Sequence, residues 1–267
     1  MKNKQFVVFT DLDGTLLDHH SYSFEAALPA LNMLKQRHIP VVLNSSKTRP
    51  EMEQLRIDLE NTSPFICENG GALIIPATEF GTPQEQVINF AEPIEQIIAV
   101  LADLRQQGFA FRSFNDMSEA DVADITGLSL SRAKSAKQRL ATEPLLWNGS
   151  DEELLQFEAA VGQRNLQLVK GGRFYHVMGQ YDKGDAMAYL MERYRESDPQ
   201  KQWCSVALGD SNNDERMLEL ADYSMVIKGV NSDSVLVNSS KPNLVRSNAP
   251  GPEGWNETIT KLLQNEA

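Results

Sequence analysis

Short, continuous apolar runs and helical stretches follow one another in the first part of the chain. A run that stays apolar without alternating is typical of a strand buried on both faces, as in a parallel sheet. The expected strands are residues 6–9, 40–44, 65–67 and 72–75, and the expected helices are residues 23–37 and 49–60. This rhythm predicts a doubly wound, mostly parallel, Rossmann-like α/β sheet.

The pattern changes after about residue 84. The candidate strands here are residues 87–90, 109–114, 145–147, 166–170 and 173–178, and the candidate helices are residues 93–107 and 151–163. The last two strands flank Gly171-Gly172, which is the signal of a two-residue hairpin turn. Because a hairpin is antiparallel, we expect an inserted α+β domain over residues 84–180.

The parallel rhythm resumes at Lys183. The expected elements are a helix to about residue 195, a strand at 204–208, a polar turn at 209–214, a helix to 220, strands at 224–227 and 244–245, and a helix at 255–264. We therefore expect one core formed by residues 1–83 and 181–267, with the second domain inserted between these two parts.

Composition narrows the class of partner. The 267 residues are 41% apolar, enough to bury a sizeable core, and they carry a formal net charge of −12. Such a chain repels nucleic acids and anionic lipids at long range. No window is long and apolar enough for a membrane span, and the N-terminal apolar run is too short for a signal peptide. We expect a cytoplasmic protein without an obligate protein partner, and two free thiols at Cys67 and Cys204.

Asp11 and Asp13 follow the first buried strand directly. Side chains at positions i and i+2 of an extended segment point the same way, so both carboxylates can face one site at the carboxyl end of the sheet. Two neighbouring carboxylates repel each other unless a cation is present, and Mg²⁺ prefers oxygen ligands of this kind. A simple polar turn is the alternative interpretation.

A second acidic cluster, residues 209–214 (GDSNND), also follows a buried strand and opens a helix. Asp210 stands at the strand end, as Asp11 does in the first unit, and Asp214 is placed about one helical turn further on. Helix capping by Asp and Asn is the alternative explanation for this cluster. It accounts for Asp210 less well, because the first cluster already requires another acidic ligand.

Two further residues are candidates for binding an anion. Lys183 is expected at the start of a helix, where a cation opposes the helix dipole, and this local conflict points to a function. Ser45 ends the second strand, where a hydroxyl group and backbone amides can bind phosphate oxygens. A surface lysine and a polar loop are the alternatives for these two residues.

Taken together, these segments resemble the four motifs of the haloacid dehalogenase superfamily, in their order along the chain. The segments are residues 11–15 (DLDGT), Ser45 after an apolar strand, Lys183, and residues 209–214. The chain looks like the phosphatase branch with a C2-type cap inserted between the second and third motifs. Four motifs in order are more specific than any one of them.

The resemblance implies a mechanism. Asp11 would attack phosphorus and form an aspartyl-phosphate, and Asp13 would protonate the leaving oxygen and then activate water. Mg²⁺ would be held by Asp11, by Asp210 and by the main-chain carbonyl of Asp13, with Asp214 as a direct ligand or an indirect partner. Ser45 and Lys183 would bind the phosphoryl oxygens.

A narrower resemblance is to the mannosyl-3-phosphoglycerate phosphatases, which release phosphate to give mannosylglycerate. It is carried by residues 44–48 (NSSKT), 68–71 (ENGG), 142–144 (TEP), 171–176 (GGRFYH) and 251–255. It implies a small phosphorylated sugar–glycerate substrate and a specificity site in the cap.

Cap residues would then choose the substrate. Arg173 is the first choice for the substrate carboxylate, because a guanidinium group binds a carboxylate in bidentate fashion. Arg139 and Lys134 come next, Glu143 could accept hydrogen bonds from sugar hydroxyls, and Asn69 in the ENGG segment is a further candidate. A solvated face is the alternative for the charged residues, and His176 and Trp147 are expected to serve packing.

Other functions remain open at this point. The same chemistry could act on glucosyl-3-phosphoglycerate or another sugar phosphate, and a mutase would return the phosphate instead of releasing it. A non-catalytic binding protein with this fold would be expected to have lost a nucleophile or a metal ligand. Asp11, Asp13, Lys183 and Asp210 are all present, which favours an enzyme.

Overall fold

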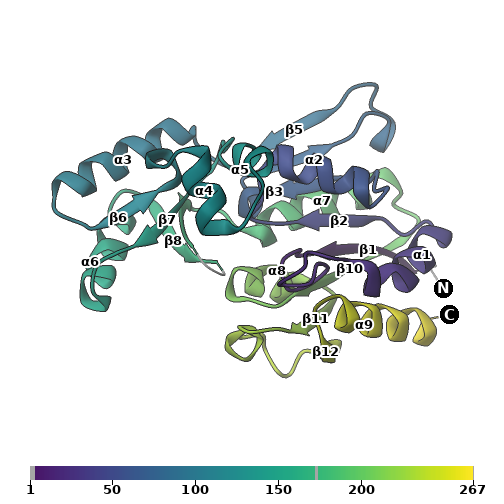
Figure 1. Ribbon diagram of the computed structural model, residues 1–267. Helices are drawn as coiled ribbons and strands as arrows, with labels where there is room; N and C mark the ends of the chain where they lie inside the picture. Colours follow the sequence, from purple (N-terminus) through teal and green to yellow (C-terminus); the bar gives the residue numbers. More distant parts are fainter. Residues whose placement is uncertain (1–3, 172–173, 267) are drawn as a thin grey trace.

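The apolar runs form the large sheet of the computed structural model, which describes residues 4–171 and 174–266 (Figure 1). Its strands are β1 (Lys4–Thr10), β2 (Val41–Asn44), β3 (Phe65–Cys67), β4 (Ala72–Ile75), β5 (Gln86–Asn89), β10 (Gln202–Gly209), β11 (Tyr223–Lys228) and β12 (Leu244–Pro250). Within the described residues their order is β12-β11-β10-β1-β2-β3-β4-β5. Neighbouring strands pair in parallel from β12 along the sheet to β3. The strand β4 pairs antiparallel with both of its neighbours, β3 and β5. The predicted doubly wound, mostly parallel sheet is confirmed.

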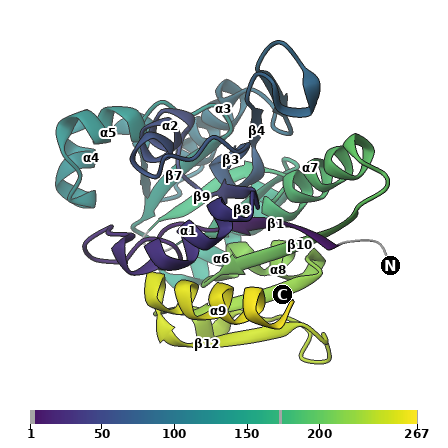
Figure 2. The same cartoon turned by 90° about the vertical axis from the view of Figure 1, so that its right-hand side faces the viewer.

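The lack of alternation in β1 has a direct structural cause. Phe6 and Val8 pack in the hydrophobic cluster on one face of the sheet, whereas Val7 and Phe9 pack in the cluster on the other face. The covering helices are α1 (Leu28–Gln36), α2 (Arg49–Asp58) and α9 (Gly251–Asn265) on the first face, and α7 (Lys183–Ser197) and α8 (Glu215–Leu220) on the second. Figure 2 shows α1 beside α9 on one side of the sheet. A strand covered on both sides must be apolar at every position.

The last helix fixes the end of the central strand. Trp255 of α9 is fully buried, and its indole N–H donates a hydrogen bond to the hydroxyl of Thr10 at 3.0 Å. The Thr10 hydroxyl in turn donates to the carbonyl oxygen of Asp11 at 2.7 Å. The chain thereby leaves β1 in a defined direction just where the first acidic cluster begins.

A second, smaller sheet lies beyond the carboxyl edge of β1, and Figure 1 shows it to one side of the large sheet. Its strands are β6 (Phe111–Ser113), β7 (Thr142–Trp147), β8 (Leu166–Lys170) and β9 (Tyr175–Gly179), in the order β6-β7-β9-β8. All three pairings are antiparallel, which confirms the expected β8–β9 hairpin. We call residues 90–180 the cap and the large sheet with its helices the core.

Helices cover the cap in two groups. α3 (Ile94–Gln106) and α6 (Asp151–Gly162) pack on one side of the small sheet, and α4 (Glu119–Thr126) and α5 (Leu130–Ala136) build a separate small cluster. The short helices α4 and α5 were not predicted. β5 pairs with β4 in the large sheet, so the strand expected near residue 87 adds to the core sheet. None of the described helices combines the length and the apolar character that crossing a membrane requires.

One carboxylate ties the core to the cap. Glu68 begins a 3₁₀ turn of the core (η2, Glu68–Gly70), has a positive φ of 51°, and is almost fully buried. Its two carboxylate oxygens accept hydrogen bonds from the backbone N–H groups of Leu140, Ala141 and Thr142 at 2.8, 3.0 and 2.9 Å. The Thr142 hydroxyl donates a further bond at 3.1 Å. The segment that enters β7 is therefore fixed to the core by side-chain hydrogen bonds, in addition to the two chain crossings.

Glu68→Gln should destabilise the protein by about 2–4 kcal/mol, because an amide offers one acceptor and turns an NH₂ group toward backbone N–H donors. Urea unfolding of the two proteins measures this difference. Glu60→Gln is the matched control, since the Glu60 side chain is 78% exposed and pairs with Lys35 on the surface. Equal unfolding midpoints for the Glu68 and Glu60 variants would contradict the structural role of Glu68.

Candidate active site

The carboxyl ends of β1 and β10 bring the two acidic clusters together. These strands pair in parallel from Lys4 with Gln202 to Thr10 with Leu208, and the N–H of Asp11 donates to the carbonyl oxygen of Leu208 at 2.9 Å. Asp11 therefore lies beside the turn that carries Asp210. Both side chains are buried, with 6% of each residue exposed.

Lys183 is the buried cation of this cluster. It is the first residue of α7, after the N-cap Asp182, and it is completely buried. Its Nζ donates to Oδ1 of Asp11 at 2.5 Å and to Oδ1 of Asp214 at 2.7 Å. Burial alone would lower the pKa of Lys183, but the neighbouring carboxylates of Asp11 and Asp214 raise that pKa above its usual value. Lys183 is therefore charged. Because it is completely buried, the alternative interpretation of Lys183 as a surface lysine is excluded.

Asp214 organises the second cluster. Its Oδ1 accepts from Lys183, and its Oδ2 accepts the backbone N–H groups of Asp210 and Ser211, both at 3.1 Å. Both carboxylate oxygens of Asp214 are therefore engaged by the protein. This arrangement holds the turn after β10 in the conformation that aims Asp210 at Asp11.

Three buried aspartates place carboxylate oxygens close enough together to surround a divalent metal. One carboxylate oxygen from each of Asp11, Asp210 and Asp214 lies within 4.8 Å of the others. Burial raises the pKa of Asp11 to about 7 and the pKa of Asp210 to about 8. Lys183 supplies one positive charge against three carboxylates, so additional positive charge is required for all three to be ionised. All-oxygen donors of this kind suit a hard divalent ion.

Two glycines shape the space around Asp210. A Cβ atom at Gly14 or at Gly229 would lie 2.7 Å from Oδ2 of Asp210, closer than a side chain tolerates. Gly14 also has a φ of 85°, which is favourable only for glycine. The hydroxyl of Thr15 donates to the other oxygen of Asp210 at 3.1 Å. The carboxylate of Asp210 is held in a slot that only small residues can form.

Asp13 has one oxygen paired and one oxygen free. Its Oδ2 accepts a hydrogen bond from Nζ of Lys47 at 2.6 Å. Its Oδ1 is buried and has no hydrogen-bond partner within the described part of the chain. A buried acceptor without a donor is uncommon.

A cavity of about 510 Å³ lies between this edge of the core and the cap. The core contributes Asp11, Asp13 and Asp210 to its lining, together with Ser46 and Lys47 from the loop after β2. The cap contributes Phe114, Thr126, Leu128, Ala136, Arg139, Pro144, Gly171, Phe174 and His176. A ligand in this cavity would contact reactive groups of the core and a largely apolar surface of the cap.

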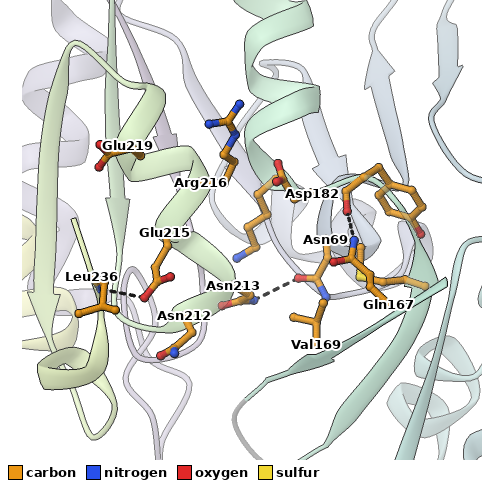
Figure 3. Close-up of a pocket in the computed structure, with 13 residues that line it drawn as sticks. Asn69, Gln167, Val169, Asp182, Asn212, Asn213, Glu215, Arg216, Glu219 and Leu236 are labelled. Atoms are coloured by element: carbon orange, nitrogen blue, oxygen red, sulfur yellow. Dashed lines mark hydrogen bonds between the residues drawn. The ribbon is translucent and has the colours of Figure 1, made fainter. Parts of the chain in front are cut away.

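Ser45 and Asn69 lie near the site without lining this cavity. Ser45 is buried at the end of β2, and its hydroxyl accepts the N–H of Lys47 at 3.3 Å. The Oδ1 of Asn69 accepts a hydrogen bond from Asn213 at 3.1 Å, while its Nδ2 is buried without a partner among the described residues (Figure 3). Asn69 lines a second cavity of about 380 Å³, and Asn213 lines both.

Two of the charged cap candidates, Arg139 and Glu143, are bonded within the protein, whereas Lys134 lies exposed on α5. The guanidinium of Arg139 donates to the Thr142 carbonyl at 2.8 Å and to the Ser46 carbonyl at 2.8 Å, and it lies 3.7 Å from Glu68. Its side chain is 5% exposed, so the solvated-face alternative does not hold for Arg139. Glu143 is buried, its Oε1 accepts the N–H of Asn115 at 2.6 Å, and burial raises its pKa.

Arg173 lies outside the described residues, so its expected role stays a prediction. His176 was expected to serve packing, and it does lie buried in β9, but it also lines the cavity. Its Nδ1 has no partner among the described residues, and burial lowers its pKa to about 3, so the ring is neutral. The sequence offered one signal, its position in the cap hairpin close to Gly171.

Comparisons with known proteins agree with this geometry. A family model of haloacid dehalogenase-like hydrolases matches residues 8–237. A glucosyl-3-phosphoglycerate/mannosyl-3-phosphoglycerate phosphatase from Methanococcoides burtonii is 36% identical over 269 residues, covering 96% of this chain and 97% of that relative.

Solved structures show the same fold. A haloacid dehalogenase-like hydrolase from Bacteroides thetaiotaomicron has a TM-score of 0.67 at 17% identity and covers 97% of this chain and 99% of its own. A sucrose-phosphatase from Synechocystis, in complex with sucrose and phosphate, has a TM-score of 0.66 at 14% identity. The match covers 97% of this chain and 98% of the sucrose-phosphatase chain. The chain therefore belongs to the haloacid dehalogenase-like hydrolase family, and within that family it is a phosphatase.

Proposed function

We propose that this phosphatase hydrolyses the phosphate ester of mannosyl-3-phosphoglycerate or glucosyl-3-phosphoglycerate, with Asp11 as the nucleophile. The observation that carries the proposal is the pairing at the sheet edge. The carboxylate of Asp11 is held by the buried Lys183, and Asp11 and Asp13 line the same cavity. The substrate class is supported by the relative of 36% identity, whose name covers both sugars.

The reaction has two displacements at phosphorus. An oxygen of Asp11 attacks phosphorus while the ester P–O bond breaks, and Asp13 in its protonated form gives its proton to the departing alkoxide oxygen. A water molecule then attacks phosphorus of the aspartyl-phosphate, Asp13 takes the proton from that water, and the acyl-phosphate P–O bond breaks. Inorganic phosphate and the glycosylglycerate are released, and Asp11 returns as a carboxylate.

Lys183 and the acidic turn support both displacements. The Nζ of Lys183 touches Asp11, so it is close to the oxygens of a phosphoryl group bound there and can stabilise their charge. Bound Mg²⁺ would supply further positive charge to the same oxygens, held by Asp11 and Asp210 with the main-chain carbonyl of Asp13. Because both oxygens of Asp214 are engaged by Lys183 and backbone N–H groups, we assign Asp214 a positioning role.

Asp11→Asn should lower the rate of phosphate release from mannosyl-3-phosphoglycerate by at least about 1,000-fold, because an amide does not form the acyl-phosphate. Phosphate release with saturating Mg²⁺ measures this loss, and circular dichroism checks that the variant is folded. Asp58→Asn is the control, since Asp58 is exposed on α2 away from the cavity. Near-normal turnover by Asp11→Asn would refute the covalent mechanism.

Removal of divalent metal by a chelator should abolish activity, and added Mg²⁺ should restore it. Asp210→Asn should then raise the Mg²⁺ concentration for half-maximal activity by at least about tenfold, because one anionic ligand is lost. In the metal-free protein the same substitution should leave the melting temperature unchanged or higher, since it removes a carboxylate from a buried, crowded cluster. An unchanged Mg²⁺ requirement would exclude Asp210 as a ligand.

A further inference from the structure

Lys47 has no role in the mechanism above, although it lies in the cavity. It stands two residues after Ser45, in the loop that follows β2, and its side chain is 19% exposed. Its Nζ donates to Oδ2 of Asp13 at 2.6 Å and lies 5.5 Å from the centre of the Tyr22 ring. The lysine is therefore held on two sides by the core and keeps part of its surface toward the cavity.

Among the described residues that line the cavity, the lysine and arginine cations come from Lys47 and Arg139. Arg139 gives its Nε and Nη donors to Thr142, Ala136 and Ser46. An ammonium group has three N–H donors, and the hydrogen bond to Asp13 uses one of them. Lys47 therefore has donor capacity for a ligand, and Arg139 has little.

The position of Lys47 matches the chemistry of a phosphoglycerate ester. In 3-phosphoglycerate derivatives, two carbon atoms separate the carboxylate from the carbon-bound ester oxygen on one short chain. Asp13 must approach that ester oxygen within hydrogen-bond distance, about 2.6–3.2 Å, to protonate it. A cation 2.6 Å from the Asp13 carboxylate is therefore within reach of the substrate carboxylate.

Charge makes such a cation necessary. The cavity is lined by the carboxylates of Asp11, Asp13, Glu51 and Asp210, and the substrate adds a carboxylate to its phosphate group. A carboxylate placed among these acidic side chains without a cation would be repelled at short range. A lysine side chain is a flexible point charge, so one ammonium can contact both Asp13 and the substrate carboxylate.

We propose that Lys47 binds the glycerate carboxylate of the substrate and makes this site prefer phosphate esters that carry a carboxylate. The inference rests on the proposed function and specifies its substrate class. It assigns the binding of the substrate carboxylate to Lys47 of the core, whereas the sequence alone assigned this role to Arg173 of the cap.

The test compares two substrates that differ in one group. 3-Phosphoglycerate carries a carboxylate where glycerol 3-phosphate carries a hydroxymethyl group, and the ester to be cleaved is the same. Lys47→Met should lower the ratio of kcat/KM for 3-phosphoglycerate over glycerol 3-phosphate by roughly 10- to 100-fold, the usual size of a lost charge-assisted hydrogen bond. The loss should lie mainly in KM, and the same variant should lose affinity for mannosyl-3-phosphoglycerate.

The ratio of kcat/KM for the two esters is insensitive to an indirect effect of Lys47→Met on proton transfer by Asp13. If the substitution disturbs Asp13, kcat falls for both esters by the same factor and the ratio of their kcat/KM values stays constant. Lys201→Met is the matched control for charge, since Lys201 directly precedes β10, at the amino ends of the parallel strands and far from the cavity at their carboxyl ends. Lys47→Arg keeps the charge and should recover most of the wild-type ratio.

Three outcomes would overturn the assignment: an unchanged ratio in Lys47→Met, a wild-type enzyme with no preference for 3-phosphoglycerate, or a ratio that depends on Arg173→Ala but not on Lys47→Met. Failure of the proposed function has a different signature. A wild-type enzyme that does not cleave either glycosyl-3-phosphoglycerate, but cleaves other esters, would refute that function. The matched pair would still decide whether Lys47 recognises carboxylates.

Discussion

The ion pairs of the buried Lys183 with Asp11 and Asp214 are the interaction on which the site depends. A fully buried ammonium is stable only where carboxylates surround it, and the desolvation of all three groups is offset only by good geometry. That geometry joins the end of β1, the start of α7 and the turn after β10. Three segments far apart in the sequence must be correctly placed before the charges are compensated.

This requirement also sets where the cap can be inserted. The chain leaves the core after β5 and returns just before Asp182, the residue that caps α7. The start of α7 that carries Lys183 is fixed locally, because the Asp182 side chain accepts hydrogen bonds from the N–H groups of Gly184 and Asp185. The acidic cluster belongs to the core, and the apolar surface that lines the cavity belongs mainly to the cap.

Much of the core and its acidic cluster could be predicted from the sequence. A parallel sheet buried on both faces leaves continuous apolar runs, and carboxylates directly after two such runs must meet if the strands are neighbours. Helices α4 and α5 were missed, although Ser118 with Asp121 forms a capping box and Gly127 ends the first helix. These short helices have little periodicity of their own, so the pattern of apolar positions does not predict them.

The bonding of Arg139 and Glu68 could not be predicted in the same way. Both residues have partners across the core–cap boundary, and Glu68 binds backbone groups more than 70 positions away. No local pattern records such a partner. The sequence placed Arg139 at the substrate; in the structure it lines the cavity, and one of its Nη groups also donates to the Ser46 carbonyl in the loop after β2. A charged residue near a site can thus serve the attachment of the domain that covers it.

The slot that holds Asp210 has a consequence for how the sequence can change. Gly14 and Gly229 carry no chemical group, yet a methyl group on either would collide with the Asp210 carboxylate. Position 14 tolerates neither a side chain nor, at its positive φ, the usual backbone of other residues. In a survey of all single substitutions, these two positions should therefore be as intolerant as the aspartates themselves. The positions on which the site depends therefore include residues, such as Gly14 and Gly229, that contribute no reactive atom.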